Sequence, residues 1–321
     1  MIFDTHGDIF TDVTIRRLNG ETDVIKNRHL ARFKEGGMVG GAFVIWIDPP
    51  YDTAPKQRML DSIRCVSAEL SGATDILNVI TDKAGFYQSL KEEKLAVLMV
   101  IEGLQAIGED VDYLYVLHRL GFRQASLTWN EQNDLATGVK GDPERGLTEA
   151  GKKAVRIMEE LGMMIDLSHA NDKTFYDILS IATKPLIASH SNARSLCAVP
   201  RNLTDEQIKL VAQTGGVIGL NAFAEFISPE KEKRDLEHFI DHADYMKALV
   251  GNEHLAFGFD FIDYLGDNTL DSFVQDTSAS GLTKDLESIS CGKKVIEAFK
   301  KRGYTDEEME GIGWKNYIEL F

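Results

Sequence analysis

The chain has 321 residues, 43% of them hydrophobic and 27% charged, which is the composition of a globular protein with a sizeable buried core. Its 51 Asp and Glu residues outnumber its 35 Lys and Arg residues, so the formal net charge is −16 at pH 7. Such a charge repels phosphate backbones and anionic lipid headgroups, and we therefore expect neither nucleic acid nor a membrane surface as a partner.

The first residues already form an apolar segment without the pattern of a signal peptide, and no stretch reaches the roughly 20 apolar residues of a membrane-spanning helix. We therefore expect a cytoplasmic protein. The three cysteines, Cys65, Cys197 and Cys291, show no C-x-x-C spacing. Neither a disulfide framework nor a thiolate metal site is indicated.

Short apolar segments recur along the chain, with helical patterns between them. Eight of them are bounded by Gly, Pro or polar clusters: 2–8, 41–47, 96–102, 122–129, 163–169, 186–191, 216–221 and 255–261. Most are too uniformly apolar for half-exposed strands, which indicates parallel strands covered by helices. Eight βα units predict a closed α/β barrel of the (β/α)₈ TIM type, and no linker or repeat divides it, so we expect one domain over 1–321.

The segments between the predicted strands carry helix start and stop signals. Capping boxes are predicted at Thr204-x-x-Gln207 and Thr305-x-x-Glu308. Residues 148–162 place apolar side chains on one face, and Gly162 is expected to end that helix. The polar segment 263–290 follows the last predicted strand and is expected to form a long, lid-like loop.

Ionisable residues close five of the predicted strands, at the end of a parallel barrel where active sites lie. They are His6, Asp8, Glu102, His169, His190 and Asp260. Any one of them could be a hydrogen-bonded core histidine or an aspartate that caps the next helix. Together, three imidazoles and three carboxylates at one barrel mouth would concentrate buried charge, which is costly without a compensating partner.

Two divalent cations would balance that charge, because their four positive charges match Asp8, Glu102, Asp260 and a bridging hydroxide. The hypothesis is that Glu102 bridges two ions, one also held by His6 and Asp8. The second ion would be held by His169 and His190. Zinc suits this mixture of imidazole and carboxylate ligands best, although manganese or cobalt could serve.

The motifs DTHGD, VIEG, SLTWN, DLSH, SHSNAR, PRN and GFDF, in this order, resemble those of the renal or membrane dipeptidases, a branch of the amidohydrolase superfamily with a binuclear zinc site. The resemblance implies that the five metal ligands are His6, Asp8, Glu102, His169 and His190. It further implies that Arg201 holds the carboxylate at the C-terminus of the substrate, and that Asp260 carries the proton. The planar fork of Arg201 suits a free carboxylate, since it can bind one through two hydrogen bonds.

Two positions depart from the membrane-bound branch of that family. Trp129 stands where the branch has a histidine that contacts the substrate. The segment Asn221, Ala222, Phe223 stands where the branch carries a tyrosine, so that substrate contact is absent or replaced. An indole offers one neutral donor, so Trp129 either contacts the substrate or only forms a wall of the pocket. Stabilisation of an oxyanion would then fall to a metal or to Asn130.

The resemblance implies hydrolysis of dipeptides, including those with a D-residue on the C-terminal side, by a hydroxide that bridges two metal ions. Related enzymes often dimerise, which makes a homodimer an expectation as well. The same site could instead hydrolyse N-acyl amino acids or β-lactams, because the hydroxide and the arginine are indifferent to the acyl side. A non-catalytic barrel that binds metal and peptides is the alternative from another class.

Four further residues are interpreted as structural. His238 and His242 have i, i+4 spacing on a predicted helix but lack the glutamate of an HExxH motif. Asp4 shares strand parity with His6 and is expected to make supporting hydrogen bonds below it. Asp166 has odd parity relative to His169, so we expect it to point away from the site and to anchor a neighbouring segment.

Overall fold

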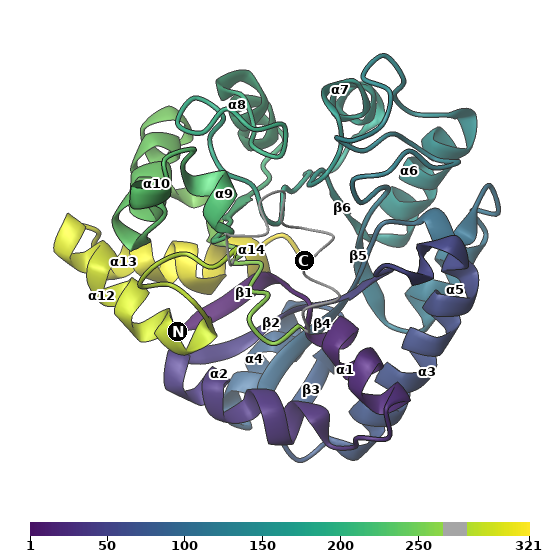
Figure 1. Cartoon of the computed structure of the whole chain (residues 1–321), viewed down its shortest axis with the longest axis horizontal. Coiled ribbons are helices and arrows are strands. Elements are labelled where there is room, and N and C mark those ends of the chain that lie inside the picture. The colour runs from purple at the N-terminus through teal and green to yellow at the C-terminus, as the bar shows by residue number, and fades with distance from the viewer. Residues whose placement is uncertain (266–280) are drawn as a thin grey trace.

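The computed structural model describes residues 1–265 and 281–321. Its strands gather at the centre of the molecule and its helices surround them (Figure 1). The strands are β1 Ile2–Gly7, β2 Met38–Trp46, β3 Leu77–Ile80, β4 Leu95–Glu102, β5 Phe122–Ser126, β6 Met164–Asp166, β7 Ile218–Leu220 and β8 Leu255–Phe257. The helices are α1 Ile9–Leu18, α2 Leu30–Gly36, α3 Pro55–Gly72, α4 Lys83–Lys91, α5 Tyr113–Arg119, α6 Glu149–Leu161, α7 Asp172–Ile181, α8 Asp205–Gln213, α9 Ala224–Ile227, α10 Leu236–Val250, α12 Gly292–Arg302, α13 Asp306–Glu310 and α14 Asn316–Ile318.

The sheet runs β1-β2-β4-β5-β6 with every pair parallel, and β7 pairs with β8. Residues 187 and 188 link the two parts, because Ile187 bridges to Asp166 of β6 and Ala188 bridges to Ile218 of β7. On the other side β8 returns to β1, where Asp260 N donates to His6 O at 3.3 Å. The strands therefore curl into a barrel, as the sequence predicts.

The register of the sheet aligns one row of side chains at the carboxyl ends of the strands. Trp46 pairs with Glu102, Glu102 with Ser126, and Ser126 with Asp166. Because these positions lie level across four strands, Glu102 and Asp166 belong to the same layer of the barrel mouth.

The barrel closes where β1 and β8 lie close to the backbone at Ser189. Thr5 Oγ1 lies 2.6 Å from Ser189 O and 3.0 Å from Phe257 O, so that it ties β1 to β8 and to the segment that carries His190. A Cβ atom at Gly258 would lie 1.7 Å from Ser189 O, and one at Gly219 would lie 1.8 Å from the same oxygen. Only glycine fits at these two positions, which brings the segment that carries His190 close to β8 and β1.

The helix signals in the sequence are confirmed. Thr148 caps α6 by accepting from Gly151 N at 3.0 Å, and Gly162 ends it with a φ of 68°. Both predicted capping boxes, at the starts of α8 and α13, are present. Buried residues such as Ala154 and Met158 lie on the face of α6 that packs on the barrel.

The strands differ from the prediction in several places, and the predicted 122–129, 216–221 and 255–261 are shorter in the structure. The strand β3 is missing from the sequence interpretation, because its Asn78 and Val79 are not buried and interrupt the apolar run. The predicted strand 163–169 is only Met164–Asp166, and 186–191 contributes isolated bridges rather than a ladder. Within the expected lid, 263–290, residues 266–280 lie outside the described part. That the chain forms one domain stays a prediction.

Candidate active site

The predicted site residues come from separate strand ends and meet in one place. His6 lies near the end of β1, Glu102 ends β4, and Asp260 follows β8. His169 follows β6, and His190 follows the bridging residues 187 and 188. The side chains of His6, Glu102, His169 and His190 are 1–7% exposed, and that of Asp260 is 13% exposed. Asp8, directly after β1, is also buried.

One oxygen of Glu102 faces three imidazole rings. Glu102 Oε1 lies 2.8 Å from His169 Nε2, 3.3 Å from His190 Nε2 and 3.5 Å from His6 Nε2. The Nε2 atoms of His169 and His190 are themselves 2.9 Å apart. Four potential ligand atoms from four separate segments thus converge on a space of a few ångströms.

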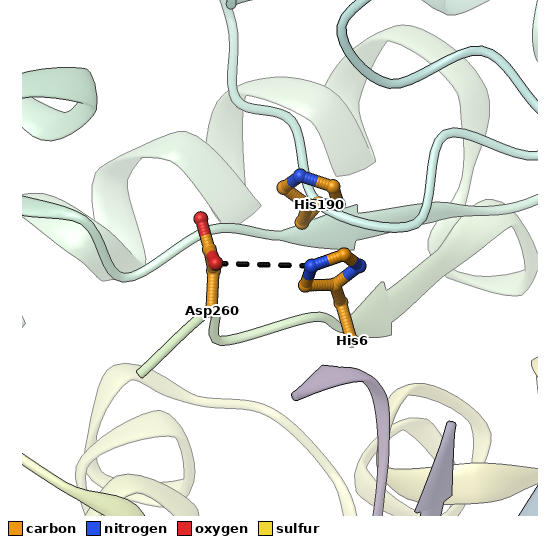
Figure 2. A group of neighbouring side chains, drawn as sticks. All are labelled: His6, His190 and Asp260. Carbon is orange, nitrogen blue, oxygen red and sulfur yellow. Dashed lines mark ion pairs between the residues drawn. The ribbon is translucent and has the colours of Figure 1, made fainter. Parts of the chain in front are cut away.

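Three overlapping groups in the described residues have ligand atoms within 4.8 Å of one another. They are His6–Asp8–Glu102, Glu102–His169–His190 and His6–His190–Asp260. The first two are the groupings that the sequence predicts for two ions, and they share Glu102. The third adds Asp260, whose Oδ1 lies 3.8 Å from His6 Nε2, with His190 beside them (Figure 2).

The carboxyl groups of this cluster are hard to ionise without a cation. Burial raises the pKa of Glu102, and the neighbouring Asp8 and Asp260 carboxyls raise it further. Burial also raises the pKa of Asp8, with Asp260 adding to the effect. Burial raises the pKa of Asp260 to about 6, while Arg201 and Asn221 act in the opposite direction. A bound cation reverses such shifts because it favours the charged carboxylate.

The imidazoles are held neutral and present lone pairs to the cluster. Burial lowers the pKa of His6 to about 3, and those of His169 and His190 well below their ordinary value. His169 Nδ1 lies 2.8 Å from the amide oxygen of Asn130, which can only accept, so Nδ1 carries the proton and Nε2 does not. Among the described residues, His6 Nε2 has no hydrogen-bond partner. Lone pairs that face a carboxylate oxygen fit a metal ion between them, and the residues therefore suit the predicted metal centre.

Two of these residues have an unusual backbone conformation. His169 has a φ of 69° and Asp260 a φ of 59°, in the left-handed region that residues other than glycine seldom adopt. Such strain is typical of residues whose side chains must point in one direction for function. It also explains why both side chains turn into the barrel mouth directly after their strands end.

A cavity of about 320 Å³ opens above the cluster. Its lining consists of Glu102, Trp129, Asn130, Val139, Lys140, His169, Val199, Pro200, Arg201, Phe223, Glu225, Phe226 and Asp260. Arg201 is 7% exposed and its Nη2 donates to His190 O at 3.3 Å. Its Nε has no hydrogen-bond partner among the described residues, so a buried guanidinium faces the cavity with a donor to offer.

The residues that depart from the membrane-bound branch also lie at this cavity. The ring of Trp129 packs 5.0 Å from that of Trp46 and 5.9 Å from that of His169, which makes it part of the wall. Phe223 packs against Phe226 at 4.8 Å and adds an apolar side. Asn130 lines the cavity and also accepts from His169, a contact that the sequence interpretation does not foresee.

The residues interpreted as structural are mostly placed as expected. His242 accepts from Ala193 N and contacts Ile227 O, and His238 bonds Asp235, all away from the cluster. Asp4 accepts from His6 N at 3.2 Å and Phe259 N at 3.0 Å, so it supports the site from below.

The interpretation of Asp166 is half wrong. Asp166 does anchor a neighbouring segment, since it accepts from Ser189 N at 2.9 Å, but it points toward the site rather than away from it. Parity fails because β6 ends at Asp166 and the chain turns sharply before His169. Ser189 and Asn221, which donates to Asp260 Oδ2 at 3.1 Å, are also missed. The sequence did carry a signal for both, because Ser189 directly precedes the predicted ligand His190 and Asn221 ends the predicted strand 216–221.

The parallel barrel carries at its mouth a cluster of buried imidazoles and carboxylates that could hold metal ions, and its fold is that of the amidohydrolases. An amidohydrolase from Pseudomonas aeruginosa, 19% identical, shares the fold with a TM-score of 0.77 over 100% of this chain and 95% of that chain.

A sequence model of the membrane dipeptidase family (peptidase family M19) matches residues 1–321. The chain belongs to this family, as its motifs indicate, and is a metallo-dipeptidase. Dipeptidase tcpJ of Claviceps purpurea is 32% identical over 230 residues, which cover 71% of this chain and 50% of that protein. A metallo peptidase from Rhodobacter sphaeroides, solved with a phosphinate mimic of the dipeptide L-Ala-D-Ala, is 25% identical with a TM-score of 0.86 over 99% of this chain and 97% of that chain.

Among the described residues, none of the helices combines the length and the apolar character that crossing a membrane requires. Cytoplasmic residence and a homodimer stay predictions.

Proposed function

We propose that this chain hydrolyses dipeptides, including those with a D-residue on the C-terminal side, and that it uses two zinc ions. His6, Asp8 and Glu102 would hold one ion, and Glu102, His169 and His190 the other. The observation that carries the proposal is Glu102 Oε1, which lies within 3.5 Å of three imidazole nitrogens below a cavity with a buried arginine. Three imidazoles and two carboxylates form a ligand set that zinc favours.

When bound, the ions would supply a water of lowered pKa and positive charge that stabilises the carbonyl oxygen of the scissile bond. The protein supplies the rest. Arg201 binds the terminal carboxylate through its free Nε edge and fixes the distance from that carboxylate to the scissile bond. This fixed distance limits substrates to dipeptides and their close analogues.

In this proposal Asp260 moves the proton. Its Oδ2 is held by Asn221 at 3.1 Å and its Oδ1 lies 3.8 Å from His6 Nε2, so the carboxylate stands at the edge of the ligand cluster and on the cavity wall. It takes the proton of the attacking water and gives it to the departing amine. The apolar walls formed by Phe223 and Phe226 exclude bulk water from this transfer.

A substrate panel tests this function on the zinc-loaded protein, with metal content measured on the same preparation. We expect L-Ala-L-Ala and L-Ala-D-Ala to be cleaved, and the same dipeptides with a C-terminal amide to lose at least about tenfold in kcat/KM, since Arg201 then has no charged partner. Faster turnover of an N-acyl amino acid or a β-lactam would assign the site to those amides instead. Dipeptide that stays intact after long incubation would leave only a binding function.

Replacing Arg201 by methionine tests the carboxylate contact. The variant keeps an unbranched side chain but removes the guanidinium with its charge and donors, so we expect KM for a dipeptide to rise by about 10- to 100-fold with a smaller change in kcat. The dipeptide amide should be cleaved equally well by both proteins. Arg123→Met is the matched control, because Arg123 lies near the start of β5, bonds His118 O and Phe122 O and does not line this cavity, and its KM should stay within about threefold of the original. An unchanged KM in Arg201→Met would remove the role.

A further inference from the structure

The hydroxyl of Ser189 is buried beside the ligand cluster. Its single proton can be donated to only one of the several polar atoms around it. Ser189 Oγ is 2.7 Å from His190 Nδ1 and 3.4 Å from His6 Nδ1, and it also contacts Asp166 Oδ2. Ser189 is 1% exposed and Asp166 is 4% exposed. The direction of each hydrogen bond here decides which nitrogen of His190 carries a proton.

Asp166 accepts at both of its oxygens. Oδ1 receives Ser168 N at 3.0 Å and Ser189 N at 2.9 Å. Oδ2 receives the side-chain amide of Gln124 at 3.2 Å and the hydroxyl of Ser189. The two backbone N–H groups and the amide can only donate to these oxygens, so the Asp166 carboxylate acts only as an acceptor.

The Ser189 proton is therefore given to Asp166, and Ser189 Oγ can act toward His190 only as an acceptor. His190 Nδ1 must then carry a proton, and His190 Nε2 presents its lone pair 3.3 Å from Glu102 Oε1. Asn130 has the same effect on His169 through a different chemical group. Both rings thus present an unprotonated Nε2 to Glu102 Oε1.

The chain of hydrogen bonds extends to the C-terminal end of the protein. Tyr317 of α14 donates its hydroxyl to Gln124 Oε1, which fixes the Gln124 amide with its nitrogen toward Asp166. Tyr317 itself is fully buried and its ring stacks on Phe3 of β1 at 5.5 Å. A substitution at Tyr317, far below the barrel mouth, can therefore alter the orientation of the Asp166 side chain through Gln124.

We propose that Asp166 and Ser189 are positioning residues that fix His190 in the tautomer with its proton on Nδ1, and so keep its Nε2 available to a metal ion. This inference rests on the proposed function, in which His190 is a ligand. Ser189 delivers the restraint, and Asp166 sets its direction by taking the hydroxyl proton.

The proposal predicts an unusual order of effects on zinc affinity. Ser189→Ala removes the restraint, and we expect the affinity to fall about 10-fold. In Asp166→Asn the new amide donates to Ser189 Oγ, so the hydroxyl turns to His190 Nδ1 and forces the proton onto Nε2, with an expected loss of about 100-fold. The double variant lacks the hydroxyl that transmits this reversal, and should therefore bind zinc more tightly than Asp166→Asn alone.

Zinc affinity is measured by competition with a chelator, using the metal-free full-length chain of each variant. Ser89→Ala is the matched control, since Ser89 is fully buried on α4 and bonds Gly85 O, away from the site. A second readout needs no metal: long-range ¹H–¹⁵N spectra of histidine-labelled protein should show His190 protonated at Nδ1 in the original chain and at Nε2 in Asp166→Asn.

The outcomes separate this inference from the proposed function. If the original chain binds no zinc, the proposed function fails, and the histidine spectra still decide the tautomer. If it binds zinc but the loss of affinity in the double variant, relative to the original chain, equals the product of the two single losses, the two changes act independently and the positioning role is overturned. The positioning role is equally overturned if His190 keeps its tautomer in Asp166→Asn.

Discussion

Replacing Glu102 by glutamine is expected to abolish metal binding and dipeptide hydrolysis together. Glu102 belongs to two of the three ligand groups, so its loss affects both predicted ions at once. Glutamine has the same shape but no charge, and its amide nitrogen can donate to the imidazole nitrogens that Oε1 now faces. We expect activity to fall by more than the roughly 100-fold that changes outside the ligand set cause.

The same substitution should have the opposite effect on the metal-free protein. Burial and neighbouring carboxyls raise the pKa of Glu102 in the folded chain, so keeping this group charged at neutral pH costs folding free energy when no cation is present. Glutamine removes that cost, and we expect the chelator-treated variant to be more stable than the chelator-treated original by about 1 kcal/mol or more.

The measurements are metal content by mass spectrometry, dipeptide turnover, and urea unfolding with and without chelator. Glu297→Gln is the control for loss of one carboxylate, because Glu297 is exposed on α12, and it should change none of these values. A Glu102→Gln protein with two ions per chain and ordinary turnover would contradict the bridging assignment. A Glu102→Gln protein that is less stable than the original chain without metal would contradict the charge argument.

The strand ends of this protein could be predicted from sequence because two simple rules operate there. Parallel strands buried on both faces are apolar throughout, so a histidine or carboxylate at the end of such a run is conspicuous. Glu102 closes eight buried residues of β4 and is the clearest case. His6 and Asp4 both lie within β1, and Asp4 supports His6 as predicted, although the register against β2 shifts between Asp4 and Gly7.

The rules fail where the backbone leaves regular geometry. Asp166 and His169 are three residues apart, yet the chain leaves β6 after Asp166 and the left-handed conformation of His169 brings its side chain to the same site. No periodic pattern in the sequence encodes that turn. The support that Ser189 and Asn221 give likewise depends on contacts between segments distant along the chain, which the strand pattern alone does not reveal.

Replacing Asp260 by asparagine is expected to separate catalysis from metal binding. Asp260 lies outside the two groups predicted to hold the ions, so the variant should keep its metal content. An amide cannot accept and return a proton as a carboxylate can, and we expect kcat to fall by about 10²- to 10⁴-fold with little change in KM. The contact with Asn221 survives, since the amide oxygen of the new residue can still accept its hydrogen bond.

The metal content of the variant decides whether Asp260 carries the proton or is a metal ligand. It also stands in a third ligand group with His6 and His190, and a residue that holds an ion would take metal with it when changed (Figure 2). Asp263→Asn is the matched control from the same segment, because Asp263 is exposed and paired with Arg32, and its kcat should stay within about twofold. Loss of one ion per chain in Asp260→Asn would make Asp260 a ligand, whereas full metal content with near-original kcat would exclude it from proton transfer altogether.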